Sequence, residues 1–322
     1  MRQIAILVLA CAVLAFAPLA VSAQDYPTRT VTVIVPFPPA GSVDGVARII
    51  VDQLNQTVGA HFIVENRAGG ASGNVGANVV AKADPDGYTL LLTASLHVVN
   101  PFLYKNVPFD VVKDFTPVTL IAAGPLIVST TPSVPANNLK DFFDLVREDP
   151  QKYTFGTTSI GSASHLVIEL LKREAHVDTL VIAYKGTGPA LTDLMSGQIQ
   201  LLADPMLSSL PQVQGGRIKA LAITSLKRQA APDIPTVEES GLPGFEFVSW
   251  YGLWGPKDLP ADITAKLQTS VAKVLAQPDV KARLTALGFE AIGSTPDYFA
   301  KYIASEMAKY GQIIHDANIK SE

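Results

Sequence analysis

Apolar residues follow two different spacings along this chain, and each spacing predicts a different element. Every residue from Thr30 to Val35 is β-branched, which is typical of a buried strand. After a turn rich in proline, apolar residues recur at helical spacing at Val43, Val46, Ala47, Ile50 and Leu54. Similar apolar runs predict strands at residues 61–65, 88–93, 126–130, 179–183, 199–203 and 218–224. Helices are predicted between most of these strands, including residues 139–147, 164–175 and 189–196.

Alternating strands and helices predict an α/β fold with open, largely parallel sheets that helices cover on both faces. Beyond Ala261 the spacing is helical only, and helices without strands must pack on a sheet formed elsewhere. We therefore expect the C-terminal helices to return to the N-terminal lobe. Lobe 1 is predicted at residues 24–124 and 248–322, and lobe 2 is the insertion at residues 125–247. The two chain crossings between the lobes predict a hinge beside a central ligand cleft.

The N-terminus has the pattern of an export signal. One basic residue, Arg2, precedes an apolar run from Ile4 to Leu19, and the small residues Val21-Ser22-Ala23 follow. This pattern predicts a signal peptide at residues 1–23, cleaved after Ala23, and a mature protein in the periplasm. The alternative is a membrane anchor, but the apolar run is shorter than the roughly 20 residues that a spanning helix needs.

Composition narrows the class of protein. Hydrophobic residues make up 48% of the chain and charged residues 17%, so the chain can bury a substantial core and is not disordered. Cys11 is the single cysteine, which leaves the mature chain without a disulfide or a cysteine-ligated metal. Without Arg2 the chain has 24 basic and 29 acidic residues, a net charge of −5. Because the sequence has no basic tract, we expect neither nucleic acid nor anionic lipid as a partner.

Two strand-turn-helix segments have similar sequences, and one falls in each predicted lobe. Residues 31–35 lead to Ala40-Gly41-Ser42, and residues 153–156 lead to Gly161-Ser162-Ala163-Ser164. Glycine allows a tight turn, and unpaired N–H groups at a helix N-terminus attract anions. Since neither loop contains Lys or Arg, the donors must be amides and serine hydroxyls, which suit a carboxylate better than a polyphosphate. The alternative is that these glycines and serines only cap the helices.

Ordered motifs along the whole mature chain match one known family. The earlier motifs are Tyr26-Pro27, Val35-Pro36-Phe37-Pro38-Pro39-Ala40-Gly41-Ser42-Val43-Asp44, Val64-Glu65-Asn66-Arg67, Pro85-Asp86-Gly87-Tyr88 and Asn100-Pro101. The later motifs are Gly161-Ser162-Ala163-Ser164-His165-Leu166, Tyr184-Lys185-Gly186, Ser208-Ser209-Leu210-Pro211 and Pro235-Thr236-Val237. The chain thereby resembles the Bug-type extracytoplasmic solute receptors of tripartite tricarboxylate transporters. The resemblance implies a type II periplasmic-binding-protein fold, in which two loops hold a ligand carboxylate through backbone amides and bridging waters.

The resemblance also implies which residues bind the ligand. The first loop is residues 37–44 and the second is residues 158–165, while Asp204 matches a position that can face the far end of the ligand. The implied ligand-binding residues are Phe37, Ala40, Gly41, Ser42, Asp44, Thr93, Ser95, Thr158, Gly161, Ser162, Ala163, Ser164, His165 and Asp204.

Two positions depart from the family pattern. The family usually has Gly-Gly where this chain has Ala40-Gly41, so the first loop is expected to be less able to adopt a positive φ at its first position. The family commonly has Asp-Asn-x-Pro where this chain has Asp204-Pro205-Met206-Leu207, a change in the wall that bears on ligand preference. Near the second lobe crossing, Trp250, Tyr251 and Trp254 alternate as in a strand, and we expect them in the hinge or core rather than against the ligand.

Other site chemistries fit the sequence less well. The run from Gly156 to Gly161 has the wrong spacing for a nucleophile elbow, and Ser164 and His165 are neighbours that point apart on a helix. The five histidines show no close ligand spacing, so we expect no metal. Residues 69–76 lack the Gly-x-Gly-x-x-Gly pattern, so we expect no dinucleotide cofactor.

The predicted function is therefore the periplasmic capture of a small carboxylate, without catalysis. Its ligand is predicted to be an organic acid, an aromatic acid or an amino acid. By resemblance, its partners are the subunits of a tripartite tricarboxylate-type membrane permease, and we expect a monomer. Two alternatives remain open: a ligand-sensing periplasmic partner of a membrane sensor kinase, and a secreted hydrolase.

Overall fold

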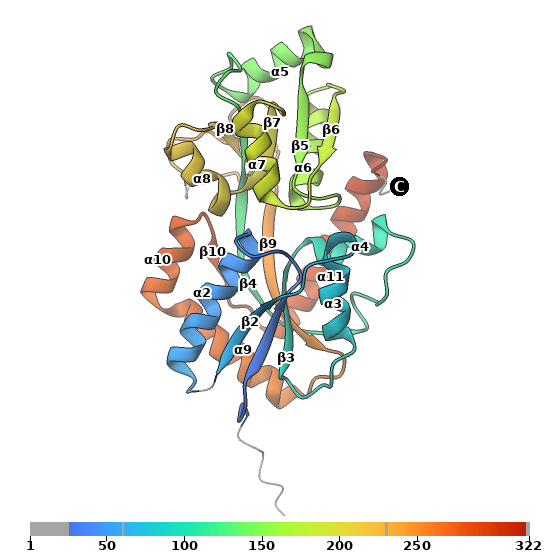
Figure 1. Cartoon of the computed structure of the whole chain (residues 1–322), viewed down its shortest axis with the longest axis vertical. Helices are drawn as coiled ribbons and strands as arrows, with labels where there is room; N and C mark the ends of the chain where they lie inside the picture. The colour runs from blue at the N-terminus through green and yellow to red at the C-terminus, as the bar shows by residue number, and fades with distance from the viewer. Residues whose placement is uncertain (1–25, 60, 229–230, 320–322) are drawn as a thin grey trace, which may run out of the picture.

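The computed structural model describes residues 26–59, 61–228 and 231–319. The predicted signal peptide, residues 1–23, lies outside the described residues. The chain forms two α/β lobes, one above the other in Figure 1, and two strands run between them. This is the two-lobed α/β architecture that the sequence predicts.

Lobe 1 is built on a parallel sheet of three strands. β1 (Val31–Val35) pairs in parallel with β2 (Phe62–Asn66) on one side and with β3 (Thr89–Ala94) on the other. The helices that follow these strands are α2 (Ser42–Thr57), α3 (Asn74–Ala81) and α4 (Leu96–Leu103). Since each of these helices begins beyond the carboxyl end of a strand, the N-termini of α2 and α4 lie at one edge of the sheet, which faces lobe 2 (Figure 1).

Lobe 2 repeats this arrangement. β5 (Thr154–Thr157) lies between β6 (Leu180–Ala183) and β7 (Leu201–Pro205) and is parallel to both, while β8 (Lys219–Ile223) pairs with the hinge. The helices are α5 (Leu139–Glu148), α6 (Ala163–Glu174), α7 (Thr187–Ser196) and α8 (Met206–Gln214). Because α6, α7 and α8 follow the carboxyl ends of β5, β6 and β7, their N-termini face lobe 1 (Figure 1).

The hinge consists of two antiparallel strands, β4 (Phe115–Thr130) and β9 (Val248–Pro256). Their pairing runs from Phe115 opposite Pro256 to Pro125 opposite Val248, and from Leu126 onward β4 pairs with β7 instead. The sequence predicted only residues 126–130 of β4, because Pro125 interrupts the pattern there. Proline lacks the N–H that a strand ladder needs, and Pro125 stands where β4 changes partners. The predicted lobe boundaries fall inside β4 and just before β9, and they stay a prediction.

The C-terminal helices pack on lobe 1. α9 (Ala261–Ala276) packs against α2, and α10 (Pro278–Ala286) follows it. α11 (Pro296–Asp316) packs on β4 and α4 and reaches α6 of lobe 2 (Figure 1). Between these helices, β10 (Glu290–Ala291) pairs with β4. This region is otherwise helical, as the sequence predicts, and a two-residue strand is too short to leave an alternating pattern.

The two faces of β9 belong to different cores. Trp250 and Trp254 face a core that extends to Phe155 of lobe 2, whereas Tyr251 and Leu253 face a core between the sheet and helices α2 and α9. All five side chains are fully or almost fully buried. Since a large side chain contributes roughly 1.5 to 3 kcal/mol on full burial, β9 is fixed by packing on both faces.

Candidate functional site

The first loop joins β1 to α2. Gly41 caps α2 with an extended backbone and without a side-chain hydrogen bond. Ala40 adopts a φ of 67°, in the left-handed region that costs an alanine about 1 to 2 kcal/mol. Alanine is less suited than glycine to this φ, as the sequence predicts, but Ala40 adopts it nevertheless. Neighbouring hydrogen bonds hold Ala40 in this conformation.

Asp44 supplies these hydrogen bonds. Its carboxylate is 3% exposed and accepts from the Ala40 N–H at 3.0 Å, the Arg48 Nε–H at 2.9 Å and Asn66 Nδ2 at 3.0 Å. Burial raises the pKa of the Asp44 carboxyl, but the three hydrogen bonds outweigh burial and lower that pKa below its usual value. Asn66 also donates to the carbonyl oxygen of Phe37 at 3.1 Å. The Ala40 amide is thus used within the loop, and Asp44 positions the loop.

The first turn of α2 leaves its amides available to an anion. The first hydrogen bond within this helix runs from the Gly45 N–H to the Gly41 carbonyl oxygen, at 2.9 Å. The amides of Ser42, Val43 and Asp44 precede that bond, and Gly41 offers them no side-chain acceptor. Such amides, together with the helix dipole, bind anions without a cationic side chain.

The second loop joins β5 to α6 and is held by its own polar groups. Gly161 has a φ of 74°, and its N–H donates to Nδ1 of His165 at 3.0 Å. The Ser162 hydroxyl oxygen accepts from the His165 N–H and from the Thr158 hydroxyl, both at 3.2 Å. The Thr158 N–H donates to Oγ of Ser164 at 3.2 Å. Most of the side-chain groups that the sequence assigned to the ligand therefore hold the loop together in this conformation.

His165 is a hydrogen-bond acceptor in this loop. Its side chain is almost fully buried, and burial, together with the nearby Lys172, lowers its pKa to about 4. The imidazole is therefore neutral above that pH, and a neutral imidazole leaves Nδ1 free to accept the Gly161 N–H. His165 thus fixes the turn that precedes α6.

The first turn of α6 is the counterpart of the first turn of α2. The first hydrogen bond within α6 runs from the Leu166 N–H to the Ser162 carbonyl oxygen, at 3.0 Å. The amides of Ala163 and Ser164 precede that bond, so helix geometry leaves them available to a ligand. The amide of Gly161 is used by His165, so it is not among the available donors of the second loop.

Asp204 ends β7 and lies at the wall of the second lobe. It is 0% exposed, and its two carboxyl oxygens accept from the Thr187 hydroxyl at 2.9 Å and the Ser209 hydroxyl at 3.1 Å. Burial raises the pKa of Asp204 to about 7, although both hydroxyls act in the opposite direction. Pro205 follows as the residue that caps α8. In this conformation Asp204 lies behind the cleft surface.

Thr93 and Ser95 lie at the carboxyl end of β3, on the same edge of the sheet as the first loop. They are 1% and 2% exposed. Thr93 pairs with Gly252 of β9, and the Ser95 N–H donates to the carbonyl oxygen of Trp250 at 3.0 Å. The structure thus attaches this part of lobe 1 directly to the hinge strand.

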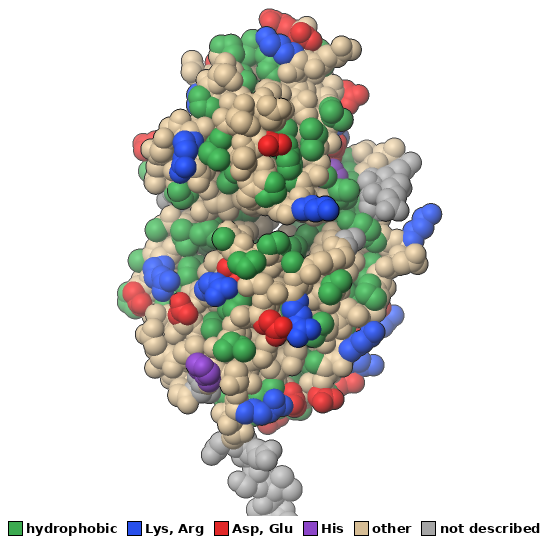
Figure 2. Space-filling view, viewed as in Figure 1, with side chains coloured by type: hydrophobic (Ala, Val, Ile, Leu, Met, Phe, Trp, Pro, Cys, Tyr) green, Lys and Arg blue, Asp and Glu red, His purple; other side chains and the backbone are tan. Residues whose placement is uncertain are grey.

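The two lobes touch on both sides of the cleft, and the space-filling view is hollowed between them (Figure 2). On one side, a Cβ added to Gly161 would lie 2.1 Å from Cδ1 of Leu103, and the Ser72 hydroxyl donates to the Ile160 carbonyl oxygen at 3.3 Å. On the other side, a Cβ added to Gly45 would lie 2.8 Å from Cδ2 of Leu207. These close approaches place the second loop against α4 and the first turn of α2 against α8, so the two lobes are in contact in this conformation.

One residue that the sequence assigned to the hinge or core has a buried polar group without a hydrogen-bond partner among the described residues. Tyr251 of β9 is fully buried, as predicted, but its hydroxyl has no hydrogen-bond partner in the described part of the chain. Burial raises the pKa of Tyr251 to about 12, the Ser42 and Ser249 hydroxyls act to lower it, and the Asp204 carboxyl acts to raise it further. Sequence alone could not show this, because Ser42 and Asp204 lie far apart along the chain.

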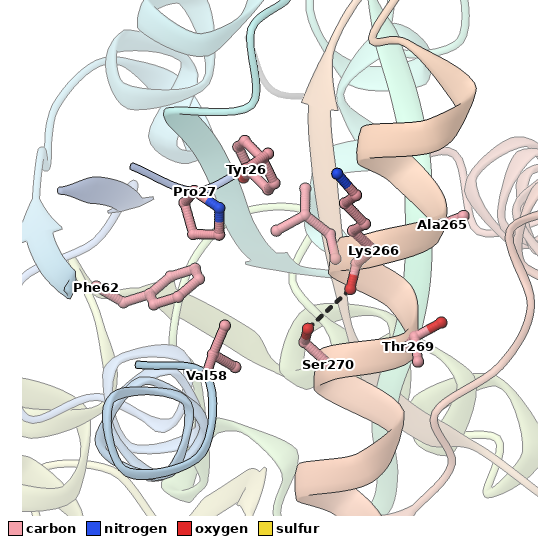
Figure 3. A pocket seen from close by; sticks show the side chains of 9 residues that line it. Tyr26, Pro27, Val58, Phe62, Ala265, Lys266, Thr269 and Ser270 are labelled. Carbon is pink, nitrogen blue, oxygen red and sulfur yellow. Dashed lines mark hydrogen bonds between the residues drawn. The ribbon is translucent and has the colours of Figure 1, made fainter. Parts of the chain in front are cut away.

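Two surface hollows lie away from the loops. One, of about 340 Å³, lies between the start of the described chain and α9, and its Ser270 hydroxyl donates to the Lys266 carbonyl oxygen of the same helix (Figure 3). The other, of about 500 Å³, lies in lobe 2 beside Tyr153 and Thr179. Within the described residues, no cluster of three metal-ligating side chains occurs, and no helix is long and apolar enough to cross a membrane.

Comparison with known proteins gives one family. The model of the tripartite tricarboxylate transporter family receptor matches residues 46–319. The periplasmic binding protein BugD is 35% identical, with a TM-score of 0.86 over 92% of this chain and 100% of BugD. Rpa4515 of R. palustris, solved with adipate, is 35% identical, with a TM-score of 0.88 over 92% of this chain and 99% of that one. MatC (Rpa3494) of Rhodopseudomonas palustris, solved with bound malate, is 34% identical, with a TM-score of 0.83 over 90% of this chain and 100% of MatC.

Proposed function

The chain belongs to the tripartite tricarboxylate transporter receptor family, and from this we propose that it is a periplasmic solute-binding protein that captures a small carboxylate between its lobes. The predicted family and the predicted periplasmic-binding-protein fold are confirmed by the same comparisons. The observation that supports the proposal is that α2 and α6 both begin where their lobe meets the other one, and that each has amides ahead of its first intrahelical hydrogen bond.

Capture follows from the chemistry of these two termini. A carboxylate that enters the open cleft accepts hydrogen bonds from the amides of Ser42 and Val43 in lobe 1 and of Ala163 and Ser164 in lobe 2. Each hydrogen bond to a charged group contributes about 1.5 to 3 kcal/mol net, and a micromolar dissociation constant requires about 8.2 kcal/mol. Three or four such bonds therefore suffice for binding, and the ligand can still be released.

The side chains of the loops hold these amides in place. Asp44 fixes the first loop through Ala40, and His165 fixes the second through Gly161. Such prior ordering reduces the entropy lost when the ligand binds. Phe37 is half-buried in the first loop, and we propose that its ring covers the apolar part of the ligand.

A thermal-shift experiment tests the proposed function. The mature protein is heated with single organic acids, aromatic acids and amino acids, including adipate and malate. At a hundredfold excess over its dissociation constant, a bound acid is expected to stabilise the protein by about 2.7 kcal/mol, which is visible as a higher melting temperature. If no acid of the panel changes the melting temperature, carboxylate capture is wrong. Mass spectrometry of the acid recovered after long incubation checks that it is bound without being converted.

We propose a membrane permease as the partner that receives the ligand, which the family name supports. Uptake of the identified acid by cells should require both this protein and the permease. The alternative partner is a sensor kinase. In that case, deletion of this protein would leave uptake intact and abolish the transcriptional response to the acid.

A further inference from the structure

A tyrosine in the hinge has a hydroxyl that the fold does not use. Tyr251 pairs with Ala94 of β3 and with Ala122 of β4, so it lies in the middle of the sheet. It is 0% exposed, and its ring packs edge-on against Phe289 with 5.1 Å between the ring centroids. Its hydroxyl has no hydrogen-bond partner in the described part of the chain. Buried polar groups are nearly always hydrogen-bonded, so this hydroxyl requires an explanation.

The Tyr251 hydroxyl lies among groups that come from both lobes. Ser249 is two residues away on the same face of β9, and Ser42 is the first residue of α2. β4 pairs with Ser249 and, two residues further along, with Pro205 of β7. The adjoining Asp204 pairs with Ile127, three residues along β4 from the partner of Ser249.

The ionisation of Tyr251 is consistent with this placement. Burial raises its pKa to about 12, weak hydrogen bonding by the Ser42 and Ser249 hydroxyls acts to lower it, and the Asp204 carboxyl acts to raise it. Neither serine makes a hydrogen bond of ordinary geometry with the phenol. The phenol therefore keeps its proton at physiological pH and remains a hydrogen-bond donor.

We propose that the Tyr251 hydroxyl is a ligand-binding group, which donates a hydrogen bond to the carboxylate at the N-terminus of α2. This inference rests on the proposed function. It adds a third hydrogen-bond donor in lobe 1 to the amides of Ser42 and Val43. When the lobes separate about β4 and β9, Ser42 and Asp204 move apart and the hydroxyl becomes accessible. A neutral donor suits this position, because the first and second loops contain no Lys or Arg.

The structural role of Tyr251 and its proposed binding role reside in different atoms. The ring fills the core beside Phe289, and phenylalanine would fill it equally well. The hydroxyl adds no hydrogen bond to the ligand-free protein, and an unpaired buried hydroxyl lowers stability. A residue kept for the core alone would have no reason to be a tyrosine.

The variant Tyr251→Phe separates these two roles. The dissociation constant of the acid identified by thermal shift, with adipate and malate as the first probes, is measured by calorimetry for wild type and variant. Loss of one hydrogen bond to a carboxylate predicts a dissociation constant roughly 10 to 100 times higher. The melting temperature of the ligand-free variant should be unchanged or higher, because the variant removes an unpaired buried hydroxyl.

Tyr310→Phe is the matched control. Tyr310 is also fully buried beside β9, but its hydroxyl oxygen accepts from Nε1 of Trp250 at 2.9 Å, on the opposite face of the strand. This variant should lower the melting temperature and leave the dissociation constant unchanged. A second readout is the tyrosine near-ultraviolet difference spectrum on ligand binding, which Tyr251→Phe should reduce and Tyr310→Phe should retain.

The outcomes distinguish the two proposals. If wild type binds an acid and Tyr251→Phe binds it equally tightly, Tyr251 is not a ligand-binding group, while carboxylate capture stands. If Tyr251→Phe loses stability and keeps its affinity, the hydroxyl is structural and the inference is likewise wrong. If wild type binds no carboxylate at all, the proposed function is wrong, and so is the proposed role of Tyr251.

Discussion

At the scale of single residues, burial decides what a polar group can do. Aspartate is usually found at protein surfaces, yet Asp204 is 0% exposed, and burial raises its pKa to about 7. Its ordinary pKa in the unfolded chain is near 3.8. The folded state therefore holds this proton more tightly, and its stabilising contribution is complete below about pH 4 and is lost as the pH rises through 7.

We expect the variant Asp204→Asn to remove this pH dependence. Asparagine has a similar size and can still accept from the Thr187 hydroxyl. At pH 8 the variant should be more stable than wild type by roughly 1 to 4 kcal/mol, since each pKa unit corresponds to about 1.4 kcal/mol. Below about pH 4 the difference should be small. Melting curves of both proteins without ligand measure this, and equal pH dependences would show that Asp204 is not a buried acid.

The sequence indicated the kind of donor at each loop but not which donors are available. The absence of Lys and Arg from both loops was visible directly, and so was the glycine before each helix. The sequence did not show that Asp44 accepts a hydrogen bond from the Ala40 amide, or that His165 accepts one from the Gly161 amide. These bonds depend on side-chain conformations that form only when each turn is folded. Which individual residues contact the ligand therefore stays a prediction.

At the scale of elements, two helices meet across the cleft. Gly45 of α2 faces Leu207 of α8, and any side chain at position 45 would contact it. Glycine in a helix costs about 1 kcal/mol relative to alanine, so its presence here is explained by the close approach of the two lobes and not by the helix. The contact joins residues from different lobes, so it forms only on closure.

The variant Gly45→Phe should hold the lobes apart. We expect a dissociation constant at least roughly tenfold higher, because a bulky side chain at the contact prevents both loops from reaching one ligand. Small-angle scattering should show that ligand no longer makes the protein more compact. The control is Asp52→Phe, at an exposed position of the same helix, which should leave affinity and compaction unchanged. Normal compaction of the Gly45 variant would contradict the contact between the lobes described above.

At the scale of the whole molecule, the lobes share a core. One hydrophobic core combines Phe142 and Phe155 of lobe 2 with Trp250 of the hinge and Tyr310 of α11. α11 begins in lobe 1 and carries Asp316 to within 3.8 Å of Arg173 in lobe 2, although such a partly exposed ion pair contributes little. The connection between the lobes is therefore mainly apolar.

We expect the mature protein to unfold in a single cooperative thermal transition. A shared core means that neither lobe can unfold while the other keeps its full packing. Differential scanning calorimetry should give a van't Hoff enthalpy close to the calorimetric enthalpy. Two separate transitions, one of which responds to ligand, would show that the lobes are independent folding units.

The sequence by itself determined most of the strands and helices, the two-lobed α/β fold and the family, and it predicts anion binding at two glycine-containing turns. These properties are encoded locally, in side-chain periodicity and in turn residues. Only the tertiary structure decided that β4 runs unbroken through Pro125, that Asp204 is buried, and that the buried hydroxyl of Tyr251 has no hydrogen-bond partner among the described residues. The physical reason is that burial and hydrogen-bond partners depend on segments far apart along the chain, which no local pattern records.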